Sequence, residues 1–362
     1  MITLVLTNRN RDLRIVKNCL QSLKEQTHTN FKVFLVDYGS DTAYQLQLVQ
    51  LLEEYPHIHY IDCPAQGQLW HKCRAINIAL QQTSTPYFIV GDIDLIFAPG
   101  FIAKATELAK SDEVHYFQYG FLSQQESLLN KDFNSYQIAF KGNEEVTGTT
   151  LFPILALKAL HGYDEFYHGW GAEDTDIHIR MKNAGLTVFF YDNEILLKHQ
   201  WHPKVYRSKQ STHPFHSQLE RINHAYMLQT HNTQRTVVNQ NQDWGKVPLL
   251  SDYEKLNQVD YVLQLEATIL EINAVLAQMA NFTNEVILFE IQAVSGIEKI
   301  KNQIKKIIGK KYQPVYDMDT VNNLLLETII KQYRNNPYSY SFDCQKNVIQ
   351  FKMYFPIRKE IL

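Results

Sequence analysis

Short apolar runs rich in β-branched and aromatic residues recur between residues 2 and 190. Helical patterns such as DLRIVKNCLQSLKEQ and HKCRAINIALQQ separate the early runs, because their apolar residues recur every three or four positions. Strands and helices that alternate at this spacing predict an α/β domain with a mostly parallel sheet covered on both faces. The predicted strands are 2–6, 31–36, 58–61, 87–90, 114–121 and 186–190.

The pattern changes near residue 246, where we place a domain boundary. A helix is expected within GIEKIKNQIKKIIGKKY, with isoleucines on one face and lysines over much of the remainder. The segment YSFDCQKNVIQFKMYF predicts a hairpin that turns at residues 345–347. We therefore expect an α/β domain at 1–245 and a smaller, mainly helical module at 246–362. An amphipathic helix in that module is predicted from the spacing of Leu265, Ile269, Ile272, Leu276 and Met279.

Composition indicates an ordinary soluble protein with a real core, since 45% of the 362 residues are hydrophobic and 20% are charged. The net charge of −3 argues against nucleic acid as a partner. Four scattered cysteines without C-x-x-C spacing argue against a disulfide framework and a cysteine zinc site. The first apolar run is too short for a signal peptide, and no other run could span a bilayer. We expect a cytoplasmic protein, and any membrane contact would be peripheral, on the inner face.

Polar side chains follow several of the predicted strands. In sheets of this kind ligands bind at the carboxyl ends of the strands, so these side chains are candidates for a binding site. Basic groups after one strand and paired acids after another suit a bound anion together with a cation. Carboxylate oxygens favour Mg²⁺ or Mn²⁺, which bind diphosphates, although a solvated turn is the alternative for a D-x-D sequence. The residues concerned are Thr7, Arg9 and Arg11, then Asp37, then Asp92 and Asp94.

The stretch HGWGAEDTDIHIRM places three carboxylates directly behind a Gly-Trp-Gly turn. An acidic first helical turn is favoured by the helix dipole, which would also lower the pKa of Asp174. That interpretation leaves Trp170 unexplained, because a large aromatic between two glycines is brought to the surface. Asp176 is expected to be structural and to pair with Arg180 one turn further on.

Histidines cluster late in the first domain: nine of the fourteen lie between residues 161 and 231. The run LLKHQWHP places His199 and His202 after the acidic helix. An imidazole beside carboxylate and phosphate oxygens shifts the preference from Mg²⁺ towards Mn²⁺. We predict His199 as a metal ligand with Asp94, and leave His202 open between a ligand and a hydrogen-bonded structural residue.

Several of these motifs resemble one family. TLVLTNRNR, FLVDYGSDT, CRAINIAL, VGDIDLIF and TGTTLFPILALKALHGYDEFYHGWGAEDTDIHIRMKNAGL are similar to segments of the GT-A fold nucleotide-sugar glycosyltransferases. The nearest likeness is to bacterial family-two enzymes of the chondroitin-polymerase type and to animal β-1,4-galactosyltransferases. It covers roughly residues 1–205 and departs at Tyr38, where many family-two members carry a second Asp.

The resemblance implies a Rossmann-like GT-A fold and a metal-dependent, inverting transferase. Such an enzyme moves a hexose or N-acetylhexosamine from a UDP-sugar to a sugar hydroxyl of a glycan or lipid-linked glycan. Mn²⁺ or Mg²⁺, held by Asp94 and His199, would be the cofactor. Asp174 would be the general base with Glu173 beside it, and Trp170 and Glu173 would bind the acceptor. Donor contacts are implied for Thr7, Arg9, Arg11, Asp37, Arg74 and Asp92.

Three other protein classes compete with this interpretation. A sugar-nucleotide nucleotidyltransferase would need a glycine-rich phosphate loop with a lysine after the first strand, and TNRNRDLR is not one. A non-catalytic carbohydrate-binding protein could keep the fold and use Trp170 as its platform, although the retained Asp94, His199 and Asp174 argue against it. A hydrolytic zinc enzyme is disfavoured because no H-E-x-x-H pairing is present.

Overall fold

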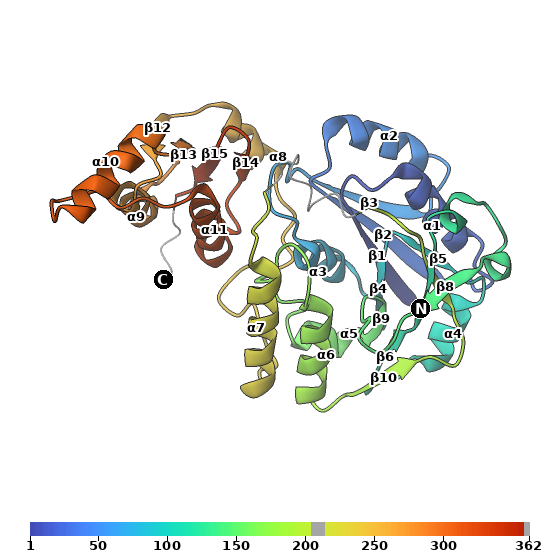
Figure 1. Cartoon of the computed structure of the whole chain (residues 1–362). Helices are drawn as coiled ribbons and strands as arrows, with labels where there is room; N and C mark the ends of the chain where they lie inside the picture. Colours follow the sequence, from blue (N-terminus) through green and yellow to red (C-terminus); the bar gives the residue numbers. More distant parts are fainter. Residues whose placement is uncertain (204–213, 358–362) are drawn as a thin grey trace. The chain divides into compact units, whose positions relative to one another are not determined.

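The computed structural model describes residues 1–203 and 214–357, which form two compact units (Figure 1). The described residues of the first unit are 1–63, 70–203 and 220–247. Those of the second unit are 64–69, 214–219 and 248–357. Each unit has its own sheet and its own buried side chains.

A seven-stranded sheet in the order β10-β6-β9-β4-β1-β2-β3 forms the centre of the first unit. Every neighbouring pair is parallel except the two made by β9, which runs antiparallel between β4 and β6. The mostly parallel sheet predicted from the sequence is therefore confirmed, while β9 was not predicted because four residues are too few for a clear pattern. The strands are β1 (Ile2–Asn8), β2 (Phe31–Tyr38), β3 (Ile58–Cys63), β4 (Tyr87–Asp92), β6 (Glu113–Phe117), β9 (Thr150–Pro153) and β10 (Thr187–Tyr191).

A second, four-stranded sheet in the order β5-β11-β7-β8 adjoins the ends of these strands. Its members are β5 (Leu95–Phe97), β7 (Tyr119–Leu122), β8 (Ile138–Lys141) and β11 (Leu197–His199). The predicted strand 114–121 is thus two strands, because the chain leaves β6 at Gln118 and enters the other sheet as β7. Antiparallel pairing of β11 with β5 sets His199 opposite Leu95, next to Asp94.

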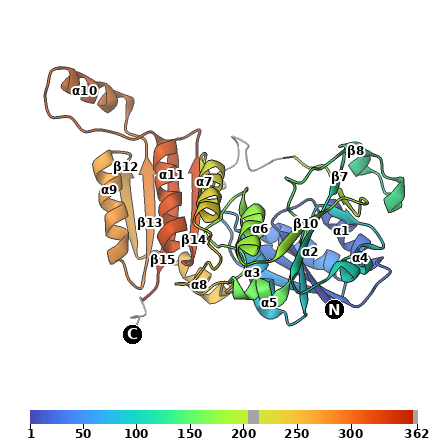
Figure 2. The ribbon, with the colours of Figure 1, turned by 90° about the horizontal axis from the view of Figure 1, so that it is seen from below.

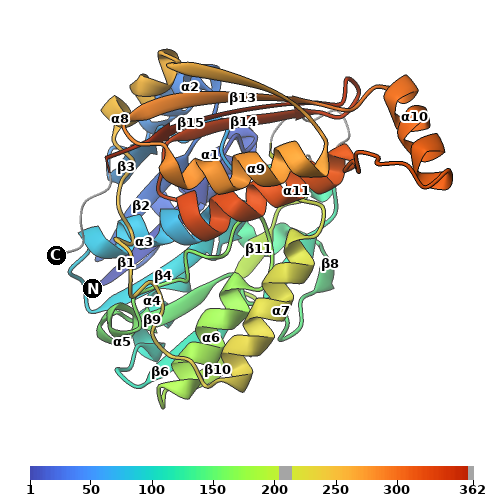
Figure 3. The ribbon, with the colours of Figure 1, turned by 90° about the vertical axis from the view of Figure 1, so that its left-hand side faces the viewer.

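Helices cover the large sheet, and the predicted helices are present as α1, α2 and α3. Asp12 caps α1 by accepting a hydrogen bond from the Arg14 backbone N–H, and the apolar face of α1 is buried in the core that includes β1. Helices α6 and α7 lie side by side (Figures 1 and 3). The helices are α1 (Leu13–Lys24), α2 (Thr42–Leu52), α3 (Lys72–Gln82), α4 (Phe101–Leu108), α5 (Ile154–Ala159), α6 (Glu173–Asn183) and α7 (Leu219–Asn232), with 3₁₀ turns η1 (Glu126–Leu128) and η2 (Phe133–Ser135).

The second unit is built on a mixed sheet in the order β12-β13-β15-β14. Helices α9 and α11 lie along this sheet, whereas α10 projects from it (Figures 2 and 3). Among the described residues, no helix is both long and apolar enough to cross a membrane. The elements are α8 (Leu250–Glu254), η4 (Lys255–Asn257), β12 (Tyr261–Glu266), α9 (Ile269–Gln278), η5 (Met279–Asn281), β13 (Glu285–Gln292), α10 (Gly296–Ile307), α11 (Met318–Thr328), η6 (Ile329–Tyr333), β14 (Tyr338–Asp343) and β15 (Val348–Phe355).

The sequence analysis understated the strand content of this unit. The terminal hairpin is confirmed, since β14 and β15 pair antiparallel around the predicted turn, but β12 and β13 were missed. The amphipathic helix predicted from Leu265 begins at Ile269, and Leu265 belongs to β12. The helix starts there because Thr268 caps it, accepting a hydrogen bond from the Glu271 N–H. A four-stranded sheet therefore accompanies the expected helices.

Candidate functional site

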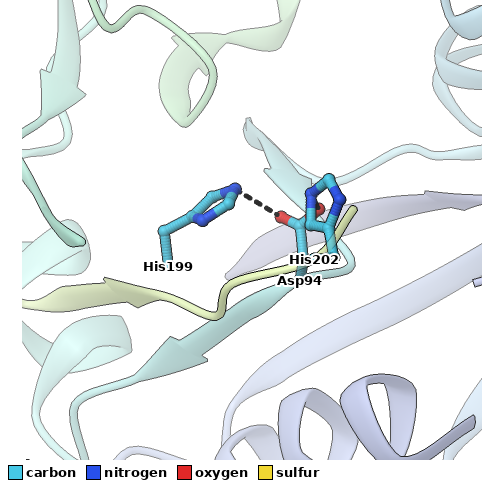
Figure 4. Close-up of side chains that lie close together, drawn as sticks. All are labelled: Asp94, His199 and His202. Carbon is cyan, nitrogen blue, oxygen red and sulfur yellow. Dashed lines mark ion pairs between the residues drawn. The ribbon is translucent and has the colours of Figure 1, made fainter. Parts of the chain in front are cut away.

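Asp94, His199 and His202 converge beside the second sheet (Figure 4). The pairing of β5 with β11 brings them together, and Gln200 N–H donates to the Asp94 carbonyl at 2.9 Å. His199 Nε2 lies 3.5 Å from Asp94 Oδ1, and His202 Nε2 lies 3.1 Å from Asp94 Oδ2. One ligand atom from each residue falls within 4.8 Å of the others. His202, left open by the sequence analysis, thus lies in the same cluster as the two predicted ligands.

The Asp94 carboxylate has the properties of a metal ligand. It is 5% exposed, and its Oδ1 has no hydrogen-bond partner among the described residues. Burial alone would raise the pKa of Asp94, but His199, His202 and the Arg11 guanidinium bring it well below its ordinary value. Arg11 Nη2 is 3.3 Å from Oδ2. A carboxylate with two imidazoles suits Mn²⁺, with Mg²⁺ the second choice, so the residues present fit the cation.

A second cluster surrounds Lys72, the first residue of α3. Its Nζ lies 2.9 Å from Asp174 Oδ2, 3.2 Å from Asp92 Oδ1 and 3.6 Å from Glu173 Oε1. One ammonium group therefore lies within 3.6 Å of three carboxyl groups. The sequence analysis missed Lys72. One feature of the sequence could have indicated Lys72: it is a cation in the first turn of a predicted helix, where the helix dipole disfavours positive charge.

Asp174 lies in the first turn of α6 with its two oxygens in different surroundings. Oδ2 accepts from Lys72, whereas Oδ1 is buried and has no hydrogen-bond partner within the described part of the chain. Burial raises the pKa of Asp174 to about 8; Glu173 and Asp92 also raise it, against the effect of Lys72. The predicted lowering by the helix dipole is therefore wrong, because desolvation and neighbouring negative charge outweigh the dipole.

Arg9 directly follows β1, and Asp92 is the last residue of β4. Arg9 Nε donates to the Tyr38 carbonyl at 2.8 Å, and its guanidinium lies 5.7 Å from the Trp70 ring centroid. Asp92 Oδ2 accepts from the Tyr119 hydroxyl at 3.1 Å. Gly148 packs closely here, since a Cβ at that position would lie 2.5 Å from Asp92 Oδ2.

Thr7, Asp37 and Arg74 are all buried. Thr7 lies on β1, in register with Asp92. Asp37 accepts from Asn8 Nδ2 at 2.7 Å and Ser40 Oγ at 2.6 Å, and burial raises its pKa. The guanidinium of Arg74 pairs with Glu165 Oε2, at 3.0 Å from Nε and 2.9 Å from Nη2. Asp37 and Arg74 are thus buried and engaged with other side chains, and their implied donor contacts stay predictions.

The Gly-Trp-Gly turn presents Trp170 to solvent with 54% of its surface exposed. Gly169 and Gly171 have φ of 71° and 102°, and Ala172 follows at 72°, so the turn needs left-handed backbone at three positions. Asn223 of α7 donates to the Trp170 carbonyl at 3.3 Å and to the His168 carbonyl. Hydrogen bonds from α7 therefore hold the turn, and its indole lies at the surface.

Asp176 lies in the first turn of α6 and is fully buried with Arg180. Arg180 Nε donates to Asp176 Oδ2 at 2.7 Å, and the Tyr167 hydroxyl donates to Oδ1 at 3.0 Å. Arg180 Nη2 also donates to the Gly162 carbonyl at 2.9 Å. The predicted Asp176–Arg180 pair is confirmed, and it ties α6 to the loop before it.

Asp176→Asn is expected to lower the free energy of unfolding by about 3–5 kcal/mol, since it leaves a buried guanidinium without its counter-charge. Chemical denaturation measures this loss, and turnover per folded molecule should change far less. Glu107→Gln is the matched control, because Glu107 pairs with Lys104 at 2.6 Å but its side chain is 66% exposed. Its loss should stay below about 1 kcal/mol. Equal losses in the two variants would contradict the structural role of Asp176.

Two overlapping segments of the chain match models of glycosyltransferase families. Residues 3–157 match the model described as glycosyl transferase family 2. Residues 129–202, which include the Gly-Trp-Gly turn and His199, match a model described as the N-terminal domain of galactosyltransferase. The resemblance inferred from the sequence motifs is confirmed.

Individual relatives are more distant. A teichoic acid poly(glycerol phosphate) polymerase of Staphylococcus epidermidis is 30% identical over 94 residues, which is 26% of this chain and only 12% of that protein. S. aureus TarS 1–349 superposes with a TM-score of 0.42 at 15% identity, covering 55% of this chain and 60% of that one. The mannosyltransferase PcManGT of Pyrobaculum calidifontis, solved with GDP-Man and Mn²⁺, has a TM-score of 0.44 at 14% identity, with 92% and 86% coverage.

Proposed function

We propose that this domain is a metal-dependent, inverting glycosyltransferase. It transfers a hexose or N-acetylhexosamine from a UDP-sugar to a sugar hydroxyl of a glycan or lipid-linked glycan. One observation carries the proposal: the short Asp92–Asp94 turn belongs to both side-chain clusters. Asp92 contacts Lys72 of the acidic cluster, and Asp94 contacts the two histidines. A cation site for a diphosphate and a carboxylate able to accept a proton are therefore adjacent.

On the donor side, Asp94, His199 and His202 would hold Mn²⁺ or Mg²⁺. When bound, the cation supplies positive charge that stabilises the leaving diphosphate. Arg11, 28% exposed and 3.3 Å from Asp94, is within reach of the same anion. Arg9 is oriented at the end of β1 by two backbone carbonyls and the Trp70 ring, which suits a nucleotide contact.

On the acceptor side, Trp170 offers a flat aromatic surface on which the C–H face of a sugar ring can stack. Asp174 Oδ1, which has no hydrogen-bond partner among the described residues, would accept the proton of the attacking hydroxyl, while Lys72 donates to Oδ2. The hydroxyl oxygen bonds to the anomeric carbon, the bond from that carbon to UDP breaks, and the proton passes to Asp174. A single displacement inverts the anomeric configuration.

The acceptor class is proposed from one relative. The short match to a polymerase of teichoic acid favours a bacterial cell-surface polymer, or a lipid-linked precursor of one, as acceptor. A glycan acceptor also suits an exposed indole beside buried carboxylates, because stacking and hydroxyl recognition are both available. Nucleic acid is not expected, as the net charge is −3.

The proposal predicts that UDP with Mn²⁺ stabilises the folded protein. At 100 times the dissociation constant, a ligand that binds only the native state adds about 2.7 kcal/mol, which thermal denaturation registers as a rise in Tm. Mn²⁺ alone, UDP with excess chelator, and GDP or CDP with Mn²⁺ are the controls. A larger shift with another nucleotide would contradict the UDP assignment. If no nucleoside diphosphate shifted Tm, the proposed donor class would be wrong.

A further inference from the structure

Helix α10 exposes a line of large apolar side chains. Isoleucine is seldom left in water in such a cluster, because each buried methylene is worth about 0.8 kcal/mol. The line continues one residue beyond the helix. Its members are Ile297, Ile300, Ile304, Ile307 and Ile308, which are 71%, 58%, 53%, 83% and 57% exposed.

The orientation of α10 explains this exposure. Among the residues of α10, all of which the structure describes, Asn302 alone is buried, and its Oδ1 accepts from the Gln313 N–H at 3.0 Å. At about 100° per residue, Asn302 lies on the side of the helix opposite the isoleucines. The helix projects from the sheet of its unit (Figures 2 and 3). Its anchored side therefore faces its own unit, and the isoleucines point away from it.

Positive charge is concentrated in α10 and the residues directly after it. The segment 296–311 carries six lysines against one glutamate, although the whole chain has a net charge of −3. Glu298 is engaged by Lys301 at 3.3 Å and by Lys305 at 3.9 Å. By helical geometry Lys301 and Lys305 border the isoleucine line, so their long stems can lie along an apolar surface while the ammonium groups stay in water. The six are Lys299, Lys301, Lys305, Lys306, Lys310 and Lys311.

We propose that α10 docks the protein on an anionic phospholipid surface, with the isoleucines in the headgroup–acyl boundary and the lysines against the phosphates. The helix has 12 residues, too few to span a bilayer but suited to lying in the interface. Pairing with a second copy through the same face would bring two lysine-rich segments together, and like charges repel. Charge complementarity therefore favours lipid over self-association. The proposal is independent of the proposed transferase reaction.

Co-sedimentation of the full chain with vesicles tests the proposal. Wild type should sediment with vesicles containing phosphatidylglycerol and stay in solution with pure phosphatidylcholine. Each lysine near an anionic surface is worth roughly a factor of five in partitioning, so changing Lys299, Lys301, Lys305 and Lys306 to Gln should weaken binding roughly 600-fold. A second variant, with Gln at Ile300, Ile304 and Ile307, should lose binding to a similar degree while keeping helix propensity.

The control has the same change of charge elsewhere on the chain. Lys17, Lys110, Lys331 and Lys346 are exposed and lie outside α10, and their change to Gln should leave vesicle binding close to that of wild type. Equal loss in this control would mean that charge alone, without α10, drives binding, and would overturn the proposal. Failure of the wild-type protein to sediment with anionic vesicles would also overturn the proposal. Sedimentation velocity without lipid tests the alternative that a second copy of the chain binds this face. If wild type formed a dimer that the isoleucine variant lost, while that variant still bound vesicles, the face would be assigned to self-association and not to lipid.

Discussion

Chelation of divalent cations is expected to reduce glycosyl transfer to background, and added Mn²⁺ to restore it more fully than Ca²⁺. The diphosphate leaving group needs its charge neutralised, and the Asp94–His199–His202 donor set suits Mn²⁺ far better than Ca²⁺, which prefers six to eight oxygen ligands. His199→Ala should raise the Mn²⁺ concentration for half-maximal activity on the order of 10–100-fold or more. Loss of a residue that only hydrogen-bonds to a metal ligand already lowers metal affinity by about this factor. Activity titrated with Mn²⁺ measures the change.

His231→Ala provides the matched control, because His231 is exposed at the last turn of α7, outside the cluster. Its Mn²⁺ dependence should equal that of wild type. His199→Ala should unfold at nearly the same temperature as wild type without metal, since His199 is only part-buried. His202→Ala should resemble His199→Ala if both imidazoles bind the cation. Full activity in excess chelator would refute the metal site.

Asp174→Asn is expected to lower kcat by about 10²–10⁴ while fold and UDP binding persist, because an amide oxygen cannot accept the proton of the attacking hydroxyl. Of the two Asp174 oxygens, Oδ1 is the one without a hydrogen-bond partner among the described residues, so the proposal assigns the proton to it. Single-turnover kinetics with saturating donor isolates this step from product release.

The pH dependence gives a second measurement on Asp174. Its pKa of about 8 means that the unliganded carboxyl is mostly protonated at pH 7, so kcat/KM should rise up to tenfold per pH unit and level off above about 8. Asp174→Asn should lose this rise.

The same pKa predicts how stability depends on pH. The folded state retains a proton that the unfolded chain releases near pH 3.8, so this group makes the free energy of unfolding fall as pH rises from about 4 to 8. Relative to wild type, Asp174→Asn should therefore gain stability across that window.

Two neighbouring substitutions separate catalysis from acceptor binding. Trp170→Ala should mainly raise the acceptor KM, since the exposed indole binds ground state and transition state alike. Glu173→Gln should affect kcat less than Asp174→Asn does, because Glu173 Oε1 lies further from Lys72, at 3.6 Å. Normal turnover by Asp174→Asn together with an inactive Glu173→Gln would assign the base to Glu173 instead.

Local patterns in the sequence were enough to predict most strands of the seven-stranded sheet. The runs at 2–6, 31–36, 58–61 and 87–90 appear as β1 to β4, because an apolar run bounded by polar residues carries its own preference for a buried strand. The Asp176–Arg180 pair was equally readable, since residues four apart share one face of a helix. Motif order also indicated the family, which the match over residues 3–157 confirms.

Contacts between residues far apart in the sequence could not be predicted from local patterns. Lys72 contacts Asp92 and Asp174 only because α3 and α6 begin where β4 ends, and His202 lies beside Asp94 only through the pairing of β5 with β11. The pKa of Asp174 was predicted in the wrong direction for the same reason. The sequence by itself determined which residues prefer strand or helix and which carry charge. The tertiary structure decided which charges are adjacent and how far water is excluded from them, because Coulomb energy and desolvation depend on distance in space.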